Sequence, residues 1–198
     1  MVPNIVNITS NGKEITDLYS FMFLKHREIY IFSEINDSVA KEVIAQMEYL
    51  DRNGDGDISV FIKSNGGSVD AGLAIIDCMR RLKCDVVTIC TGLCASMGAV
   101  IFTCGTKGKR FITPLSECMI HQPLGGIQGQ AADIEIASMH IHKVKKKIYW
   151  ILSECTGKSV DQIASDCERD NYMDASEAIE YGLADLYFGE CKEGLLYD

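Results

Sequence analysis

The chain has 198 residues, of which 47% are hydrophobic and 24% are charged, and it carries a formal net charge of −9 at pH 7. This composition is typical of one folded domain with a sizeable core and argues against a disordered chain. The acidic balance argues against nucleic acid or an anionic membrane as the main partner, because phosphate binding requires clustered Lys and Arg.

The first residues, MVPNIVNITSNGKEITD, lack the basic start and the apolar run of a signal peptide. No later segment reaches the roughly 20 apolar residues that a membrane span needs. We therefore expect a soluble, cytoplasmic protein.

Strand and helix patterns then alternate along the chain, without a repeat or a low-complexity linker. Strands are predicted at 28–35, 58–64, 85–92, 109–114, 117–123 and 184–188. Helices are predicted from Asp37 or Ser38, as the N-cap, to Leu50, and at 68–83 and 96–105. A long helix is predicted from about Ala132 to Glu154, with Gly157 as its C-terminal cap. A last helix is predicted at 176–181, where Asp174 and Glu177 form a capping arrangement at its start and Gly182 ends it. Repeated strand–helix units predict a single α/β domain over 1–198.

Between the first helix and the second strand, the segment DRNGDGDISVFI (51–62) begins like an EF-hand calcium loop, because Asp51, Asn53 and Asp55 alternate. Such a loop needs a bidentate Glu at its twelfth position and a helix after it. The twelfth residue here is Ile62, and the residues around it have a strand pattern. A turn from helix to strand therefore explains the segment better than a metal site, and no metal is predicted.

The nine cysteines are odd in number, form no CxxC pair and lie mostly in apolar segments. This favours reduced, buried thiols over disulfides or zinc ligands. The basic run from Lys143 to Lys147 is short, and we expect it on the solvated side of a helix rather than in a binding patch.

Three motifs could carry chemistry, and each also has an ordinary structural explanation. Gly66 and Gly67 precede a helix, where their backbone N–H groups either form an oxyanion hole or only a turn. Ser96 begins a helix among small neighbours and is either an N-cap or a nucleophile. His121 ends an apolar strand before a Pro and a Gly-rich loop, and is either structural or a base. A nucleophilic serine also needs a carboxylate behind its base, for which Asp170 is one of many candidates.

The segments AQM, GGSVDAG, VVTICTGLCASMGA, GTKGKRF, MIHQPLGGIQGQAADIEI, ERD and SEAIEYGLAD together resemble the proteolytic-subunit family of the Clp protease. They follow the family's order and cover nearly the whole chain. The resemblance implies that Ser96 is the nucleophile, His121 the general base and acid, and Asp170 the residue that orients His121. It also implies an oxyanion hole made of the backbone N–H groups of Gly67 and Met97.

The resemblance further implies a crotonase-like α/β fold and a large assembly. Two stacked seven-fold rings would enclose a chamber, with an axial loop at about 1–20 and a handle at about 123–157. An AAA+ Clp unfoldase, which uses the ATP, would deliver unfolded polypeptides, while this chain needs no cofactor. Substrate would lie as an added strand against Gly66, Ser68, Val69, Pro123, Leu124 and Gly125. Any propeptide is expected to be absent or already removed.

The chain departs from the family pattern at several positions. Asn65 replaces a usual Pro, and Cys94 replaces a small residue beside the nucleophile, where oxidation could block the site. Ser59 and Thr113 make the implied unfoldase-docking pocket more polar, and this pocket also contains Phe61, Phe111 and Phe188. Because a polar pocket holds an apolar anchor less well, we hypothesise a divergent or second-copy subunit that needs a paralogous ring or a different activator.

Two other functions are compatible with the same patterns. A crotonase-type acyl-CoA enzyme shares the fold and the oxyanion hole, but it would not need Ser96, His121 and Asp170 together. A catalytically silent scaffold subunit is favoured by the changes in the docking pocket and the oxyanion loop, and disfavoured by the complete set of three residues.

Overall fold

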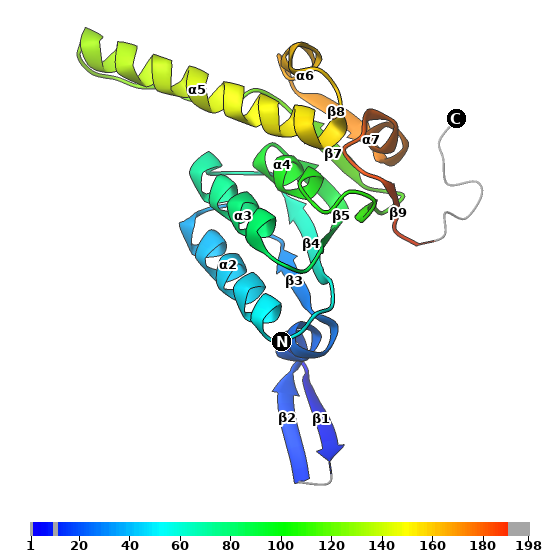
Figure 1. Cartoon of the computed structure of the whole chain (residues 1–198). Helices are drawn as coiled ribbons and strands as arrows, with labels where there is room; N and C mark the ends of the chain where they lie inside the picture. Colours follow the sequence, from blue (N-terminus) through cyan, green and yellow to red (C-terminus); the bar gives the residue numbers. More distant parts are fainter. Residues whose placement is uncertain (1, 10–11, 190–198) are drawn as a thin grey trace.

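The computed structural model describes residues 2–9 and 12–189, and its centre is a mostly parallel sheet (Figure 1). In this part of the chain, seven strands form the sheet. Five lie in parallel order: β3 (Glu28–Ile31), β4 (Ile58–Ser64), β5 (Val86–Ala95), β6 (Arg110–Ile112) and β9 (Leu186–Tyr187). The mixed α/β class predicted from the alternating pattern is confirmed.

Strand β5 is long enough to have two partners on one side. Its residues Thr88–Cys90 pair with β6, and Leu93–Ala95 pair in parallel with β7 (Glu117–Ile120). An antiparallel strand, β8 (Asn171–Asp174), then pairs with β7. The carboxyl end of β5 therefore lies between β4, through the pair Ser64 and Cys94, and this second branch, which begins with β7.

Helices connect the strands and cover the sheet. They are α2 (Asp37–Arg52), α3 (Val69–Arg81), α4 (Met97–Thr103), α5 (Ala131–Thr156), α6 (Val160–Asp166) and α7 (Ala175–Tyr181). The cap predicted at Asp37 or Ser38 is wrong, because Asn36 is the N-cap and accepts from the backbone N–H of Val39 at 3.1 Å. The capping box at Asp174 and Glu177 and the left-handed caps at Gly157 and Gly182 are confirmed.

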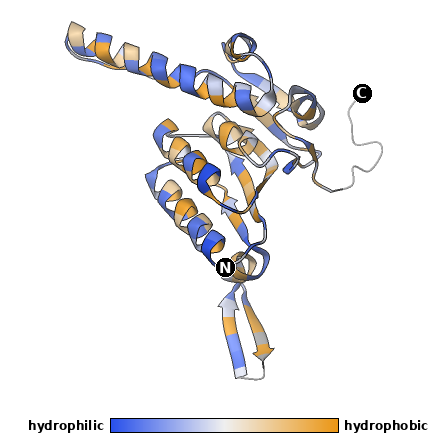
Figure 2. Cartoon of the chain, viewed as in Figure 1, coloured by the Kyte–Doolittle hydropathy of each residue, from blue (hydrophilic) through white to orange (hydrophobic). Residues whose placement is uncertain are grey.

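Hydrophobic residues gather in the central strands and in α4, whereas α2 and α3 mix hydrophobic and hydrophilic residues (Figure 2). Each of the latter two helices therefore turns one face to the core. One cluster of buried side chains runs from Ile29 in β3 through Phe102 in α4 to Ala178 in α7. A core shared along the chain in this way fits a single domain.

The N-terminal region begins with a hairpin that projects from the body (Figure 1). Its strands β1 (Asn4–Thr9) and β2 (Gly12–Asp17) are antiparallel, and α1 (Leu18–Phe21) with a π-helical turn (Met22–His26) leads into β3. No strand or helix is predicted in this region from its residues, because exposed residues have no core to impose a hydrophobic period.

The segment resembling a calcium loop is held by hydrogen bonds within the protein. Arg27, at a left-handed φ of 57°, donates from its guanidinium to the carbonyls of Asp57 (3.3 Å) and Gly54 (3.4 Å). The carboxylate of Asp51 accepts from the backbone N–H groups of Lys83 (2.8 Å) and Cys84 (3.1 Å). These bonds hold the polar turn between α2 and β4.

Helix α5 contains 26 residues and is therefore about 39 Å long. Its C-terminal part packs on the core through Ile148, Ile151 and Leu152, and its N-terminal part extends beyond the sheet (Figure 1). It occupies most of the region predicted as a handle. Among the described residues, no helix combines the length and hydropathy that a membrane span would need.

Candidate active site

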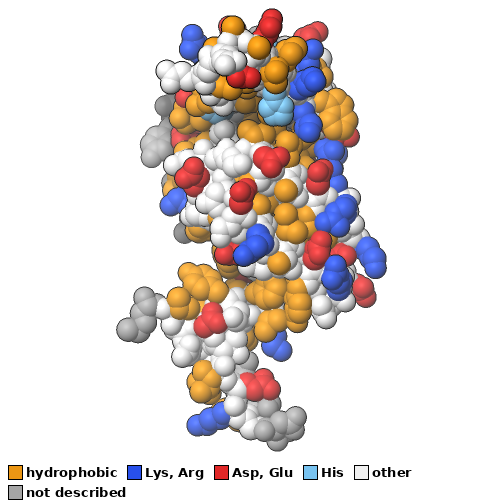
Figure 3. Space-filling view, turned by 90° about the vertical axis from the view of Figure 1, so that its left-hand side faces the viewer, with side chains coloured by type: hydrophobic (Ala, Val, Ile, Leu, Met, Phe, Trp, Pro, Cys, Tyr) orange, Lys and Arg blue, Asp and Glu red, His pale blue; other side chains and the backbone are white. Residues whose placement is uncertain are grey.

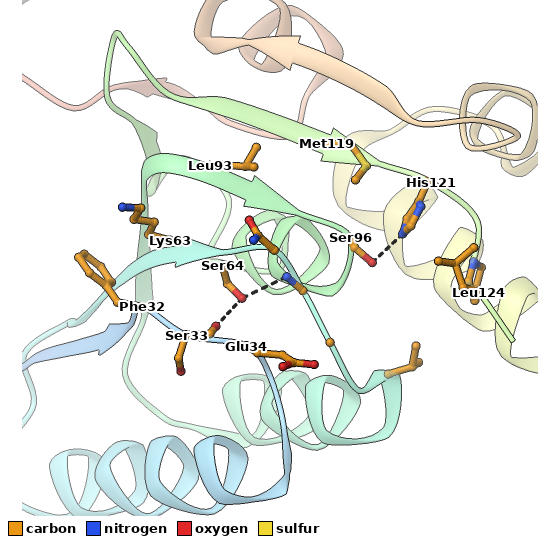
Figure 4. Close-up of a pocket in the computed structure, with 15 residues that line it drawn as sticks. Phe32, Ser33, Glu34, Lys63, Ser64, Leu93, Ser96, Met119, His121 and Leu124 are labelled. Carbon is orange, nitrogen blue, oxygen red and sulfur yellow. Dashed lines mark hydrogen bonds between the residues drawn. The ribbon is translucent and has the colours of Figure 1, made fainter.

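Ser96, His121 and Asp170 meet at one edge of the second branch of the sheet. The Nε2 atom of His121 lies 2.8 Å from Oγ of Ser96 (Figure 4), and its Nδ1 atom lies 3.1 Å from Oδ1 of Asp170. Because β5 and β7 are parallel, the residues that follow them, Ser96 and His121, emerge at the same edge. Strand β8 is antiparallel to β7, so Asp170, which precedes it, reaches that edge too.

Ser96 has an unusual backbone conformation, with φ of 53° and ψ of −124°. Its N–H donates to the carbonyl of Met119 (2.8 Å), and its carbonyl accepts from Val100 in α4 (3.1 Å). The alternative interpretation, an N-cap serine, does not describe its hydroxyl, which caps no amide of α4. A strained turn from strand to helix presents that hydroxyl to His121, as is usual for strain stored at functional sites.

The Gly66–Gly67 loop lies directly beside Ser96. A Cβ at Gly66 would lie 2.7 Å from Cβ of Ser96 and 3.0 Å from the backbone N of Met97. No hydrogen bond to the amide of Gly67 is found in the described part of the chain. The amide of Met97 is the first in α4 and has no acceptor within the helix. Gly67 lines the same cavity as Ser96, and Met97 directly follows Ser96 in the chain.

The same loop is fixed by hydrogen bonds despite Asn65, which replaces the usual Pro. The hydroxyl of Ser64 donates to the carbonyl of Ser33 (2.7 Å) and accepts from the N–H of Gly66 (3.1 Å), as Figure 4 shows. The carbonyl of Gly66 accepts from Ile35 (2.8 Å). These contacts supply the rigidity that a proline ring would otherwise give.

Gly67 is expected to be irreplaceable, because its φ is +143° and an added Cβ would lie 2.3 Å from the carbonyl oxygen of Ile35. We expect Gly67→Ala to lower the free energy of unfolding by about 3 kcal/mol, since the backbone must move. Gly108→Ala is the matched control: it also has a positive φ, of +85°, but nothing lies within 4 Å of its added Cβ. Its expected cost is about 1 kcal/mol. Equal losses for the two variants in urea denaturation would contradict the steric account.

A cavity of about 600 Å³ opens in front of Ser96 and His121. Of the residues predicted to bind substrate, Gly66, Val69, Pro123 and Leu124 line it. Ser68 and Gly125 lie outside this lining: the hydroxyl of Ser68 caps α3 by accepting from the N–H of Ala71 (3.3 Å), and Gly125 packs closely against the side chain of Ile141. The cavity is also lined by side chains that no sequence motif indicates, among them Phe32, Glu34, Lys63, Leu93 and Met119.

Gln122 is a further residue that the sequence analysis missed, although it directly follows His121. Its N–H donates to the carbonyl of Cys167 (2.7 Å), and its side-chain amide donates to the carbonyl of Glu168 (2.9 Å). Its Oε1 accepts from Lys145 of α5 at 2.8 Å. Gln122 therefore fixes the segment after His121 against the segment that leads to Asp170.

Cys94 lies two residues before Ser96 but is fully buried and does not line the cavity. Its thiol donates to the carbonyl of Ile62 (3.2 Å). Burial, together with the neighbouring thiol of Cys90, raises the pKa of the Cys94 thiol well above its usual value. Oxidation requires exposure and thiolate character, so the expectation that oxidation of Cys94 blocks the site is not supported.

Three of the predicted docking residues form one aromatic cluster, together with Tyr30. Phe188 lies edge-on to Phe61 (5.9 Å between ring centroids) and to Phe111 (6.1 Å), and Tyr30 stacks on Phe61 (5.2 Å). Tyr30, which the sequence analysis missed, is the register partner of Phe61 in the adjacent strand.

The two polar positions of the predicted docking pocket differ in their surroundings. The hydroxyl of Thr113 lies 2.5 Å from that of Ser116, which is buried, so it is already hydrogen-bonded within the protein. Ser59 pairs with Glu28 at the β3–β4 edge, and its N–H donates to the carbonyl of Arg27 (3.0 Å). Thr113 therefore adds less polarity to this surface than its residue type suggests.

The comparison with known families gives a match. A family model described as Clp protease matches residues 10–188, a range that includes Ser96, His121 and Asp170.

Proposed function

The chain belongs to the Clp protease family, and from this premise we propose that it is a proteolytic subunit that hydrolyses peptide bonds of unfolded proteins by serine catalysis. The observation that carries the proposal is the 2.8 Å contact between Oγ of Ser96 and Nε2 of His121. At this distance His121 can take the hydroxyl proton as Ser96 attacks.

In the proposed reaction, Ser96 Oγ attacks the carbonyl carbon of the scissile peptide while Nε2 of His121 accepts its proton. The imidazole donates from Nδ1 to Asp170, which fixes its tautomer and stabilises its positive charge. The N–H groups of Gly67 and Met97 donate to the oxyanion. His121 then passes the proton to the leaving amine, and water releases the acyl group from Ser96 by the same steps. Only side chains and amides of this chain are used.

Substrate is proposed to lie extended in the 600 Å³ cavity, between the segment 66–69 and Pro123–Leu124. An added strand binds through its backbone and places only alternate side chains in contact with the protein. The opposite charges of Glu34 and Lys63 in the lining give no preference for one sign of charge. This arrangement supports cleavage of many sequences.

Members of this family form oligomeric rings that work with AAA+ unfoldases, and we propose two stacked heptameric rings for this chain. Figure 3 looks onto the projecting end of α5, where hydrophobic side chains lie among charged ones. Ile134, Ile136 and Met139 are exposed there, and Leu124 and Ile127 are exposed in the segment before the helix. Such exposed apolar residues suit contact with another subunit.

The proposal includes a cytoplasmic location, which is supported by the free state of all cysteines among the described residues.

The aromatic cluster (Tyr30, Phe61, Phe111, Phe188) is the proposed docking site for the unfoldase. We expect Phe61→Ala to weaken unfoldase binding about tenfold or more, because it removes the ring that contacts both Tyr30 and Phe188. Binding would be measured by interferometry with the assembled protein, with Trp150→Ala as the control, because this exposed ring in α5 packs against Arg80 and lies outside the cluster. Undetectable binding of the unchanged homomer would support a subunit that needs a paralogous ring, whereas tight binding would exclude that hypothesis.

Asp170 is expected to contribute less than the nucleophile, because its carboxylate side chain is 59% exposed and water screens it. We expect Asp170→Asn to lower kcat for a fluorogenic peptide about 10³-fold with little change in KM, since the imidazole loses its orientation and its charge stabilisation. Asp161→Asn, on the exposed surface of α6, is the control. If Asp170→Asn kept more than about a tenth of the kcat, the assignment of three cooperating residues would fail.

The contact geometry favours an active subunit over a silent scaffold, because Ser96 and His121 are within hydrogen-bond distance. A crotonase-type acyl-CoA enzyme would leave the Ser96–His121–Asp170 contacts without a role.

A further inference from the structure

Two thiols lie side by side where α4 ends against the last turn of α5, away from the proposed active site. Sγ of Cys104 is 3.7 Å from Sγ of Cys155, although 51 residues separate them in the sequence. Both cysteines are free and half-buried. A disulfide needs the sulfurs at about 2.0 Å. Both cysteines lie at helix ends, and we expect rotation of their side chains to close the remaining distance.

Cys155 can be reached from solvent. It lines a cavity of about 350 Å³ together with Arg80, Lys107 and Arg110. The other close group of cysteines is fully buried within the sheet: Cys90 and Cys94 belong to β5, and Cys118 belongs to β7. Solvent access therefore distinguishes the Cys104–Cys155 pair from that group.

The surroundings of Cys155 favour its thiolate. A hydrogen bond with the thiol of Cys104, assisted by the positive charges of Arg80 and Arg110, lowers the pKa of the Cys155 thiol to about 7, against the opposing effects of burial and Glu154. The same hydrogen bond and burial raise the pKa of Cys104. Arg80 is held in place by Glu154 (2.6 Å) and by the ring of Trp150 (5.6 Å). The Cys155 thiolate is thus suited to attack an oxidant, and the Cys104 thiol is placed to react afterwards with the oxidised sulfur of Cys155.

We propose that Cys104 and Cys155 form a redox-active dithiol, a modification site that small peroxides oxidise to a disulfide. In the first step the Cys155 thiolate attacks one oxygen of hydrogen peroxide, the O–O bond breaks, and the departing hydroxide takes a proton to become water. In the second step the Cys104 sulfur attacks the sulfenic acid of Cys155. The S–S bond forms, the S–O bond breaks, and the hydroxyl leaves as water with the Cys104 proton.

The disulfide joins the end of α4 to the end of α5. Helix α4 has seven residues, so its other end, with Ser96, is about 10 Å away. The disulfide therefore links the element that begins at the proposed nucleophile to the long projecting helix. This inference does not depend on the proposed proteolytic function, because it concerns thiols outside the catalytic set.

The test uses the full-length protein, treated at pH 7 with graded hydrogen peroxide and then with an alkylating reagent. Peptide mapping without reductant should show that a link between Cys104 and Cys155, about 2 Da lighter than the two free peptides together, forms before any other disulfide and is reversed by dithiothreitol. In the Cys104→Ser variant, Cys155 should accumulate as a sulfenic acid that dimedone traps, because no resolving thiol remains.

Cys84 provides the matched comparison, since it is also half-buried but forms no hydrogen bond with another thiol among the described residues, and burial and Asp51 raise its pKa. We expect iodoacetamide to alkylate Cys155 at least about tenfold faster than Cys84 at pH 7, and Cys84→Ser to leave the Cys104–Cys155 link unchanged. The proposal is overturned if Cys155 reacts no faster than Cys84, or if peroxide forms a different disulfide first. Both readouts are made on the wild-type chain, so they hold even if a variant does not fold.

Discussion

Replacing Ser96 by Ala is expected to lower kcat for a fluorogenic peptide by at least about 10⁴-fold, because the attacking atom is removed and no neighbouring group can replace it. The variant should remain folded. It loses the hydrogen bond to His121, which is worth about 1 kcal/mol. The backbone conformation at position 96 should cost alanine about as much as it costs serine. Steady-state hydrolysis at saturating peptide gives kcat, and circular dichroism checks the fold.

Ser38→Ala is the control for this experiment. Ser38 lies exposed on α2, where its hydroxyl makes only a 3.5 Å contact with Glu42. Its kcat should stay within about twofold of the wild-type value. Residual activity above about a tenth of wild type in Ser96→Ala would show that another group attacks the peptide.

Replacing Arg110 by Met is expected to lower the free energy of unfolding by about 3–5 kcal/mol, the largest stability effect we predict. The Arg110 side chain is 4% exposed and forms an ion pair with Asp185, the residue that directly precedes β9. It also donates to the carbonyls of Cys155 (3.1 Å) and Gly182 (2.9 Å). Met would leave the largely buried Asp185 carboxylate without its cationic partner, with only the backbone N–H groups of Gly108 and residue 110 still donating to it. The two carbonyls would lose the guanidinium donor. Urea denaturation at one fixed protein concentration measures the loss.

The control is Arg52→Met, which removes an ion pair of Arg52, 74% exposed, with Glu48. Water screens that pair, and its loss should cost less than about 1 kcal/mol. Adding Asp185→Leu to Arg110→Met should recover part of the stability, because the unpaired carboxylate is then absent. A loss for Arg110→Met no larger than that for Arg52→Met would contradict the role assigned to the buried pair.

The same ion pair makes stability depend on pH. Burial raises the pKa of Asp185, but hydrogen bonds from Arg110 outweigh this and hold the pKa below its usual value of 3.8. A carboxyl group whose pKa is depressed by folding contributes stability above the pKa of the unfolded chain, and loses it as the pH falls through the folded value. In Arg110→Met this acid-dependent part of the stability should therefore shrink.

The α/β class and the long helix could be predicted because buried strands and a long hydrophobic period are local signals. Strand β3 was predicted to reach residue 35 but ends at Ile31, although Ile35 returns to pair with Gly67. Strand β5 was predicted to end at Gly92 but continues to Ala95, because β7 is available to pair with it there. These ends depend on partners far along the chain.

The short elements α6 and β8 were missed for a related reason. Strand β8 has four residues, of which Met173 is buried, so it shows no alternation of its own. Helix α6 has seven residues, with Ile163 as its buried residue. Neither segment contains enough apolar residues to show a period.

The candidate site was predictable in part. The positions of Ser96 and His121 at strand ends suggested chemistry, but Asp170 was selected by resemblance alone. Its place beside His121 follows from the antiparallel pairing of β7 with β8, which no local pattern reveals. Gln122 and the lining residues Glu34 and Lys63 were missed because their roles depend on contacts between distant segments.

The measurement that tests the central claim most directly is the intact mass of the chain after reaction with a fluorophosphonate. Ser96 Oγ attacks the phosphorus and expels fluoride only if His121 can accept its proton. We predict one adduct per chain, mapped to Ser96 and absent from Ser96→Ala. An unmodified wild-type chain, or an adduct that persists in Ser96→Ala, would contradict the proposal that this chain carries a competent serine nucleophile.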